Sequence, residues 1–162
     1  MSISHFDTKG QAVMADVTAK QPTHHTAIAE AKVRMQPTTL KLIQTQKAAK
    51  GDVLGVARLA GVSVSKKTPD LIPLAHPFSQ PAVSIDFDID EQNANIKVSG
   101  KVTAIERTGV EMEAMIAVSI AALTVYDMCK GVDRGIALND ISLGYKEGDK
   151  SGAYHRRERN DA

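Results

Sequence analysis

Residues 105–133 read I-E-R-T-G-V-E-M-E-A-M-I-A-V-S-I-A-A-L-T-V-Y-D-M-C-K-G-V-D, and this stretch decides how the rest of the chain is arranged. Between its polar ends the residues are almost all Ala, Val, Ile, Met and Leu, interrupted chiefly by Ser119 and Thr124. A helix that is apolar on nearly all sides is typical of a protein interior. The stretch therefore predicts one long buried helix that other elements must cover.

The ends of this helix carry their own signals. Thr108 is a suitable N-cap and Glu111 follows three residues later, which is the spacing of a capping box. Gly131 follows Lys130 directly and is the expected stop, because glycine readily adopts the conformation that ends many helices. The sequence thus predicts a helix that begins after Thr108 and ends before Gly131.

The polar residues of the helix gather in a front tip (Glu111, Met112 and Glu113) and a back tip (Asp127 and Lys130). Glu111 and Glu113 are two residues apart and point to different sides, whereas Asp127 and Lys130 are three apart and share a face. From Glu113 to Asp127 the helix rises about 21 Å, at 1.5 Å per residue. If both tips serve chemistry at one atom, a second copy of the chain is therefore implied.

The composition indicates a single domain with an aliphatic core. The 162 residues are 43% hydrophobic and 4% aromatic, and their net charge of +1 gives no general attraction to nucleic acid or membranes. We expect residues 27–146 to form the domain, residues 1–26 an N-terminal arm and residues 147–162 a flexible tail. His24 and His25 point apart in an extended segment, so we expect a surface pair and not a metal site.

Other features favour a cytoplasmic protein. Cys129 is the only cysteine, which excludes an intrachain disulfide and a multi-cysteine metal cage. The first residues lack the basic and apolar segments of a signal peptide. The apolar run from Met115 to Tyr126 is short for a bilayer and is broken by Ser119, so we expect no membrane span.

The first half of the domain predicts a strand and two helices. Apolar and polar side chains alternate over residues 27–35, the period of a half-buried strand. Pro37 favours the start of a helix, and residues 47–51 (K-A-A-K-G) break it. Asp52 is then a suitable N-cap for a second helix.

The second half supplies the remaining strands. Alternating runs at 83–89 and 96–104 predict an antiparallel hairpin, and residues 136–145 predict a closing strand after the long helix. The elements thus follow the order β-α-α-β-β-α-β. This order predicts an α+β fold, a ferredoxin-like antiparallel sheet with helices packed on one face.

Three loop residues are candidates for binding. Lys50 lies on the turn before the second helix, where a cation and free backbone N–H groups attract anions, but a solvated loop lysine fits the spacing equally well. Lys66 belongs to a small basic cluster after that helix. Pro73 and Pro77 hold His76 on a stiff extended loop, although a lone histidine is more often structural than catalytic.

Five motifs carry a resemblance to a known family. They are K-G-D at 50–52, L-I-P-L-A-H-P at 71–77, R-T-G-V-E-M-E-A at 107–114, Y-D-M-C-K at 126–130 and K-S-G at 150–152. Together they resemble the MoaC family, the cyclic pyranopterin monophosphate synthases of molybdenum cofactor biosynthesis, over about residues 12–155. Five collinear matches make chance a weak explanation.

The resemblance implies an assembly and a reaction. It implies a ferredoxin-like subunit and a homohexamer, a trimer of dimers, with its sites at the dimer interface. The reaction converts the 3′,8-cyclised derivative of GTP into cyclic pyranopterin monophosphate and releases pyrophosphate. No cofactor is implied; Mg²⁺ can accompany the triphosphate, but no residue here specifies it.

The resemblance also implies roles for individual residues. The family's acid falls on Asp127, and its catalytic lysines fall on Lys50 and Lys130. Its substrate contacts and a further basic position fall on a second set of residues. These are Lys66, Leu74, Ala75, His76, Glu111, Met112 and Glu113.

The chain departs from the family pattern in places. Ala75 stands where the family usually has cysteine, so a thiol is not required there if this protein is active. His25 and Lys67 stand in place of arginines, which weakens bidentate binding of phosphate. The Gly-containing loop at 146–152 is flexible enough to close over a phosphate, but residues 145–149 (Y-K-E-G-D) differ from the family's usual Lys-, Ser- and Gly-rich sequence.

The residue types suit the chemistry. Rebuilding a purine-derived ring into a pterin moves protons at each stage, which a carboxylate and two lysines can do without redox metals. A lysine is a poor base at neutral pH unless burial or a nearby cation lowers its pKa from about 10.4. We therefore expect Lys50 and Lys130 to lie close together, with Asp127 positioning Lys130 or donating a proton. We also expect the front tip of one subunit to meet the back tip of its neighbour.

Two alternative functions remain open. Ferredoxin-like sheets also bind RNA, but they need exposed aromatic side chains, and Phe87 is the only Phe or Tyr in the hairpin. The second alternative is a catalytically inactive member whose motifs only hold an oligomer together. Salt-dependent RNA retention tests the first alternative, and pyrophosphate release tests the second.

Overall fold

The computed structural model describes residues 5–78, 81–148 and 152–156. Its elements are β1 (Thr23–Arg34), α1 (Pro37–Gln44), α2 (Val53–Ser65), α3 (Thr68–Leu71), β2 (Ala82–Asp90), β3 (Asn95–Glu106), α4 (Glu111–Cys129), β4 (Ala137–Glu147) and β5 (Tyr154–His155). All the predicted elements are present in the predicted order, and the short elements α3 and β5 are additional.

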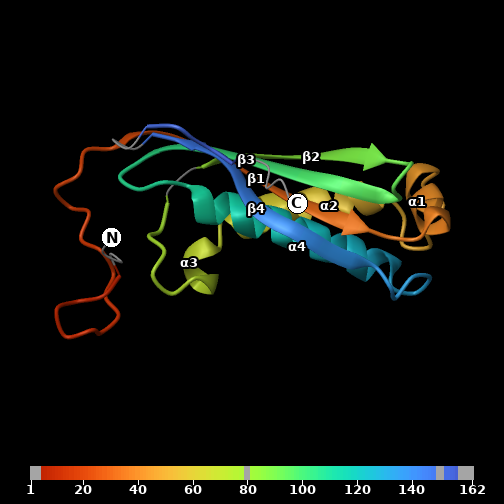
Figure 1. Ribbon diagram of the computed structural model, residues 1–162, viewed down its shortest axis with the longest axis horizontal. Helices are drawn as coiled ribbons and strands as arrows, with labels where there is room; N and C mark the ends of the chain where they lie inside the picture. The colour runs from red at the N-terminus through yellow and green to blue at the C-terminus, as the bar shows by residue number, and fades with distance from the viewer. Residues whose placement is uncertain (1–4, 79–80, 149–151, 157–162) are drawn as a thin grey trace, which may run out of the picture.

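The strands form one antiparallel sheet in the order β2-β3-β1-β4-β5. The central strand β1 pairs with β3 along its whole length, from Thr23 opposite Glu106 to Arg34 opposite Asn95. The two long helices, α2 and α4, lie on one side of the sheet (Figure 1). The predicted α+β fold, with an antiparallel sheet and helices packed against it, is confirmed.

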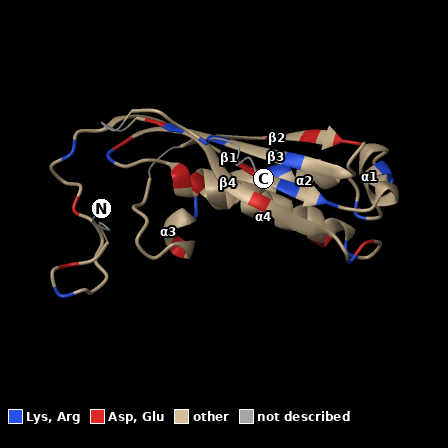
Figure 2. Ribbon diagram, viewed as in Figure 1, with Lys and Arg blue, Asp and Glu red and all other residues tan. Residues whose placement is uncertain are grey.

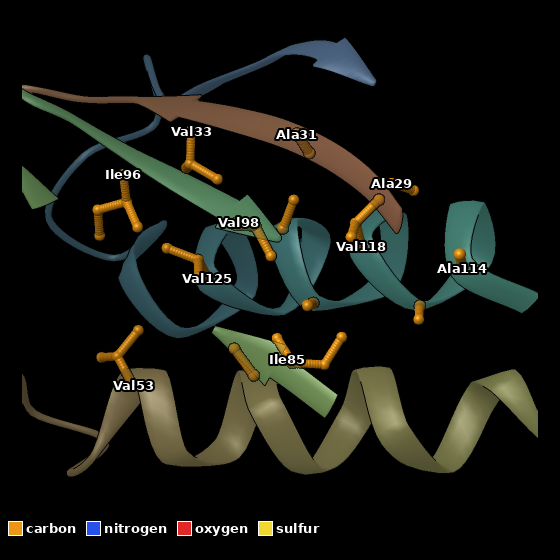
Figure 3. Packing of buried hydrophobic residues seen from close by; sticks show 14 of the residues in the cluster. Ala29, Ala31, Val33, Val53, Ile85, Ile96, Val98, Ala114, Val118 and Val125 are labelled. Carbon is orange, nitrogen blue, oxygen red and sulfur yellow. The ribbon is translucent and has the colours of Figure 1, made fainter. Parts of the chain in front are cut away.

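The core lies between the sheet and α4 and consists of small aliphatic side chains (Figure 3). The inward face of β1 contributes Ala29, Ala31 and Val33, which are at most 1% exposed. Gly100 of β3 allows a close approach, because a Cβ at this position would lie 2.7 Å from Cγ1 of Val118 on α4. Alanine and glycine on the sheet therefore bring the long helix close to the strands.

The helix α2 runs antiparallel to α4. Gly61 of α2 lies directly against the α4 backbone, because a Cβ there would be 2.8 Å from the carbonyl oxygen of Ala117. Val53, at the start of α2, lies near Val125, towards the end of α4 (Figure 3). The antiparallel packing therefore brings the turn before α2 to the back tip.

The start of α4 differs from the prediction. The helix begins at Glu111, its N-cap residue is Val110, and no side-chain hydrogen bond caps it. The predicted capping box between Thr108 and Glu111 is therefore wrong. Glu111 pairs instead with Lys146 of β4.

The end of α4 agrees with the prediction, and the helix is longer than its apolar run. The helix ends at Cys129, and Lys130 is its C-cap, just before Gly131. The helix has 19 residues, and an 18-residue window within it has a mean hydropathy of 1.5, so it is long and apolar enough to cross a membrane by length and composition alone. The apolar run of residues 115–126 is thus the middle of a longer helix. In this structure α4 forms the core helix between the sheet and α2.

Three segments near the chain ends also differ from expectation. The strand β1 begins at Thr23, so the expected arm boundary at residue 26 falls inside it. His24 is exposed but His25 is only 3% exposed, so the predicted surface pair is wrong for His25. Residues 154–155 pair with β4, although they belong to the segment 147–162 that was expected to be a flexible tail. Residues 157–162 lie outside the described residues.

The β2–β3 hairpin lacks the exposed aromatic side chains that an RNA-binding sheet uses for stacking. Phe87 of β2 packs towards α2, where the guanidinium carbon of Arg58 lies 5.4 Å from its ring centroid. On the other side of the sheet, Lys97 pairs with Glu30 at 2.7 Å. Because the one aromatic ring of the hairpin faces a helix, the stacking platform of an RNA-binding sheet is missing from residues 82–106.

Candidate active site

The back tip brings three of the predicted residues together. Nζ of Lys130 lies 2.7 Å from Oδ1 of Asp127, one turn earlier on α4. Nζ of Lys50, from the connection between α1 and α2, lies 3.5 Å from Oδ2 of the same carboxylate and 3.0 Å from the Asp127 carbonyl oxygen. Both lysines therefore reach one carboxylate within a single chain.

The local sequence explains how Lys50 reaches α4. Gly51 has a φ of +87°, which glycine adopts without steric cost, and so allows a tight turn after Lys50. Asp52 then caps α2, because its Oδ1 accepts a hydrogen bond from the backbone N of Gly55 at 2.9 Å, as predicted. The turn faces the back tip because α2 is antiparallel to α4.

The ion pairs shift two pKa values in opposite directions. Hydrogen bonding to Lys130, together with the charges of Lys130 and Lys50, holds the pKa of Asp127 below its usual range. The same contact raises the pKa of Lys130. About half of each side chain is exposed, so water screens these interactions. In the single chain, Asp127 is therefore a carboxylate and Lys130 a cation at neutral pH.

The front tip presents two carboxylates to different surroundings, as their spacing predicted. Oε1 of Glu111 lies 2.6 Å from Nζ of Lys146, and these side chains are 26% and 24% exposed. Glu113 is only 2% exposed and lies beside Thr68, the first residue of α3. Figure 2 shows acidic residues at this end of α4, close to α3.

Burial gives Glu113 an unusual acidity. Loss of hydration raises its pKa to about 7, and the charges of Glu111 and Glu106 act in the same direction. Its own backbone N–H and the side chain of Thr68 act against the shift. A carboxyl group with this pKa exchanges its proton near neutral pH, a property that suits general acid–base chemistry.

The loop of His76 is held by the N-terminal arm. Nε2 of His76 lies 2.9 Å from the carbonyl oxygen of Ala15, so this nitrogen is the protonated one when it donates to the carbonyl. A hydrogen bond of 3.1 Å from the backbone N of Ala75 to the carbonyl oxygen of Ile72 closes a turn. The loop is thus bent and follows a short helix, where we predicted an extended segment.

The predicted residues form two groups, one at each end of α4 (Figure 1). Lys50, Asp127 and Lys130 make up the back group. The front group consists of Lys66, which is exposed at the end of α2, the half-buried Leu74, Ala75 and His76, and the front-tip residues Glu111, Met112 and Glu113. Because α4 is one continuous helix, the separation of about 21 Å between the tips stands.

Two cavities lie near the sheet. The first, of about 650 Å³, opens at the front tip and is lined by Glu111, Ser142, Leu143, Lys146, Gly152, Ala153, Tyr154 and Arg156. The second, of about 730 Å³, lies over the face of the sheet that carries Glu30, Lys32 and Lys97. The back group lines neither of these cavities, so it is a surface cluster in the single chain.

Sequence reasoning missed three polar residues at or near the site. Lys146 was assigned to a loop and Arg156 to the flexible tail, because a two-residue strand such as β5 leaves no periodic signal. Asp133 follows the back tip and is 3% exposed. Its carboxylate accepts hydrogen bonds from the backbone N of Gln36 at 2.9 Å and of Gly135 at 3.0 Å. The turn-like sequence G-V-D-R-G at 131–135 was the available signal.

Metal-binding groups are not evident in the part of the chain that the structure describes. There, no three His, Cys, Asp or Glu side chains are placed to hold a metal ion. Cys129 is buried, and burial raises the pKa of its thiol, as does the charge of Asp133.

Comparison with known proteins decides the family. A model described as the MoaC family matches residues 14–149, which is most of the chain. The chain belongs to the MoaC family. This membership confirms the resemblance seen in five motifs of the sequence.

MoaC-family relatives align over almost the full length. The chain is 56% identical over 158 residues to the cyclic pyranopterin monophosphate synthase of Geotalea uraniireducens, covering 98% of this chain and 99% of that protein. It is 57% identical to the protein of the same name in Pelobacter propionicus, with the same coverage. The counterpart in Desulforamulus reducens is 51% identical over 154 residues, covering 95% of this chain and 93% of that protein.

Proposed function

We propose that this MoaC-family chain is a cyclic pyranopterin monophosphate synthase of molybdenum cofactor biosynthesis. Its substrate is (8S)-3′,8-cyclo-7,8-dihydroguanosine 5′-triphosphate, and its products are cyclic pyranopterin monophosphate and pyrophosphate. The observation that carries the proposal is identity of 51–57% over nearly the full length of three proteins with this name. The residue types at the two tips of α4 suit the chemistry.

The back group supplies the mobile protons. Asp127 raises the pKa of Lys130, so Lys130 is a cation in the single chain and holds the proton that is transferred when the five-membered ring opens. Asp127 is ionised and positions Lys130; its lowered pKa makes it a poor acid. Lys50 neutralises phosphate charge when a sugar hydroxyl attacks the innermost phosphate.

The front group binds the base and the sugar. Glu111 borders a cavity and accepts hydrogen bonds from the substrate, and His76 contacts it from the loop, together with Leu74, Ala75 and Met112. Glu113 lies beneath α3, so it acts mainly by holding the loop and by exchanging a proton near neutral pH. Lys66 adds a positive charge at the same end.

A complete site combines the front group of one copy with the back group of another. The separation of about 21 Å along α4 supports this arrangement. Exposed apolar side chains near the back tip, Leu123 (49%) and Val132 (64%), are suited to being covered by a neighbouring copy. The proposed assembly is a homohexamer, a trimer of dimers, with its sites at the dimer interface.

The proposed compartment is the cytoplasm. Cys129 is the one cysteine of the sequence and is buried, so the fold has no disulfide to form. A reducing environment suits such a chain.

The decisive experiment is an assay of the purified protein with the cyclised nucleotide. We expect equal amounts of pyrophosphate and cyclic pyranopterin monophosphate, measured by an enzyme-coupled phosphate assay and by mass spectrometry. Intact hexamers that release no pyrophosphate would reject the proposal and favour the inactive alternative.

A further inference from the structure

The junction between α2 and α3 contains a buried carbonyl group that lacks its usual helical donor. Ser65 is the last residue of α2 and is 2% exposed. In a continuing helix its carbonyl oxygen accepts from the backbone N–H four residues later, but that residue is Pro69, which has no N–H. The hydroxyl of Thr68 donates to this oxygen at 2.9 Å in its place. The Thr68 side chain therefore satisfies a buried backbone group.

The carboxyl group of Glu113, from α4, meets the same hydroxyl. Glu113 and Thr68 are both buried, and their side chains lie within hydrogen-bonding range. A threonine hydroxyl has one hydrogen to donate and lone pairs that accept. Because the Ser65 carbonyl takes this hydrogen, Thr68 can only accept from Glu113. A carboxyl group donates only when it is protonated, so this arrangement fits a neutral Glu113.

The surroundings of Glu113 oppose its ionisation. Burial raises the pKa of Glu113 to about 7, and the acids Glu111 on α4 and Glu106 at the end of β3 act in the same direction. Lys146 of β4 is paired with Glu111, and His25 of β1 is bonded within its own strand. The ionisable side chains of residues 66–70 are exposed to solvent: Lys66, Lys67 and Asp70. Glu113 is therefore neutral in mildly acidic solution and ionised in mildly alkaline solution.

We propose that Thr68 is a positioning residue whose hydroxyl hydrogen changes partner with the charge of Glu113. While Glu113 is protonated, it donates to Thr68, and Thr68 donates to the Ser65 carbonyl oxygen. When Glu113 releases its proton to solvent, the hydroxyl turns towards the carboxylate and the Ser65 carbonyl loses its donor. The hydroxyl hydrogen stays on Thr68 throughout, so one proton leaves Glu113 and otherwise only hydrogen bonds change.

Backbone hydrogen bonds connect this exchange to the loop of His76. The carbonyl oxygen of Thr68 accepts from the backbone N of Ile72 at 2.9 Å, and that of Ile72 accepts from the backbone N of Ala75 at 3.1 Å. Ala75 directly precedes His76, whose ring is held by the carbonyl oxygen of Ala15. The loop is therefore held more firmly while Glu113 is neutral. The effect on turnover rests on the proposed function, whereas the exchange of partners does not.

Infrared spectroscopy of the full-length protein tests the protonated acid. At pH 6 the C=O stretch of a protonated carboxyl group should appear in the wild type and be missing from Glu113→Gln. Thr68→Val keeps the shape of the side chain but removes the acceptor, so the band should move to higher frequency, whereas Thr68→Ser should leave it in place. The matched control is Thr124→Val, because the Thr124 hydroxyl also donates to a backbone carbonyl, that of Ile120 at 2.7 Å. Absence of a band that belongs to Glu113, or an unmoved band in Thr68→Val, would overturn the inference.

Hydrogen exchange tests the connection to the loop and does not depend on whether Thr68→Val folds. After correction for intrinsic rates, amides of residues 68–78 in the wild type should exchange about fivefold faster at pH 8 than at pH 6, the factor that corresponds to one hydrogen bond. Glu113→Gln should stay protected at both pH values, because the amide of this variant still donates to Thr68. Equal protection of the wild type at the two pH values, or equal loss of protection in Glu113→Gln, would contradict the exchange.

Kinetics separate this inference from the proposed function. At pH 6, Thr68→Val should raise KM for the cyclised nucleotide about fivefold and change kcat less, and Thr68→Ser should restore the wild-type KM. Protein that shows the infrared and exchange effects without turnover would keep the exchange of partners and reject the activity. An active enzyme whose Thr68→Val variant has the KM of the Thr124→Val control would keep the activity and reject the positioning role.

Discussion

The two tips of α4 carry carboxylates on one helix, yet the protein shifts their pKa values in opposite directions. Glu113 at the front tip is buried beside α3, and loss of hydration raises its pKa to about 7. Asp127 at the back tip is half exposed between two lysines, which lower its pKa. Burial and ion pairing thus give one element a group that exchanges protons near neutral pH and another that stays charged.

The tips also differ in how complete they are within one chain. The front tip has a cavity, an ion pair and a loop around it. The back tip is an open cluster with Leu123 and Val132 exposed nearby. Because the front tip is enclosed within one chain and the back tip is open, we infer that the back tip of one copy packs against the front tip of another. Mutations at the two tips test this difference between them.

The largest effect is expected at the back tip. Lys130→Ala should lower kcat about 10²–10⁴-fold, the usual contribution of a positioned acid or base. The measurement is steady-state pyrophosphate release, with Lys41→Ala in α1 as a matched surface control. A kcat close to that of the control would show that Lys130 takes no part in proton transfer.

The next effect tests whether the tips of different copies combine. Glu111→Ala and Lys130→Ala proteins, each of low activity, are unfolded together and refolded as a mixture. Half of randomly formed dimers are mixed and hold one intact site of two, so about a quarter of wild-type activity should return. If the mixture is no more active than the separate proteins, each site lies within one chain and the shared arrangement is wrong.

Glu113 makes stability depend on pH. Its pKa rises from 4.5 unfolded to about 7 folded, so the folded state holds the proton more tightly. The stabilisation is full below pH 4.5 and is lost as pH rises through 7, by roughly 3 kcal/mol in total. Glu113→Gln should flatten this part of the pH profile, measured by urea unfolding at pH 5 and pH 8. An equal pH dependence in both proteins would refute the buried-acid assignment.

The smallest effect is expected midway between the tips, where Gly61 touches α4. Gly61→Ala should destabilise the fold by about 1–3 kcal/mol, because the added methyl group meets the Ala117 carbonyl oxygen. Urea unfolding measures the change. Gly131→Ala is the control, since nothing lies within 4 Å of a Cβ at that position. Equal stability of the two variants would mean that α2 and α4 are less tightly packed than described.

Much of the fold was predictable because its signals are local. The alternation at 27–35 and the apolar stretch after Glu111 identify β1 and α4, and Asp52 identifies the start of α2. The capping box failed because Glu111 has a stronger partner 35 residues away, in Lys146. Hydropathy alone likewise cannot distinguish a core helix from a membrane span.

The candidate site was predictable only in part, because some of its contacts join residues that are far apart in the sequence. The pair Asp127 and Lys130 follows from helical spacing, and the structure shows it at 2.7 Å. The approach of Lys50 spans 77 residues and depends on the antiparallel packing of α2. The cavity at Lys146 requires the pairing of β5 with β4, and no sequence pattern in the tail predicts that strand.

The buried carboxylate of Asp133 has a further consequence. It ties the loop after α4 to the entrance of α1 through the backbone N of Gln36 and the hydroxyl of Thr39, at 2.9 and 3.0 Å. That loop starts beside Lys130, so its shape is settled when the protein folds. A ligand that binds at the back tip therefore contacts a pre-organised surface, and its binding free energy is not reduced by the cost of ordering this loop.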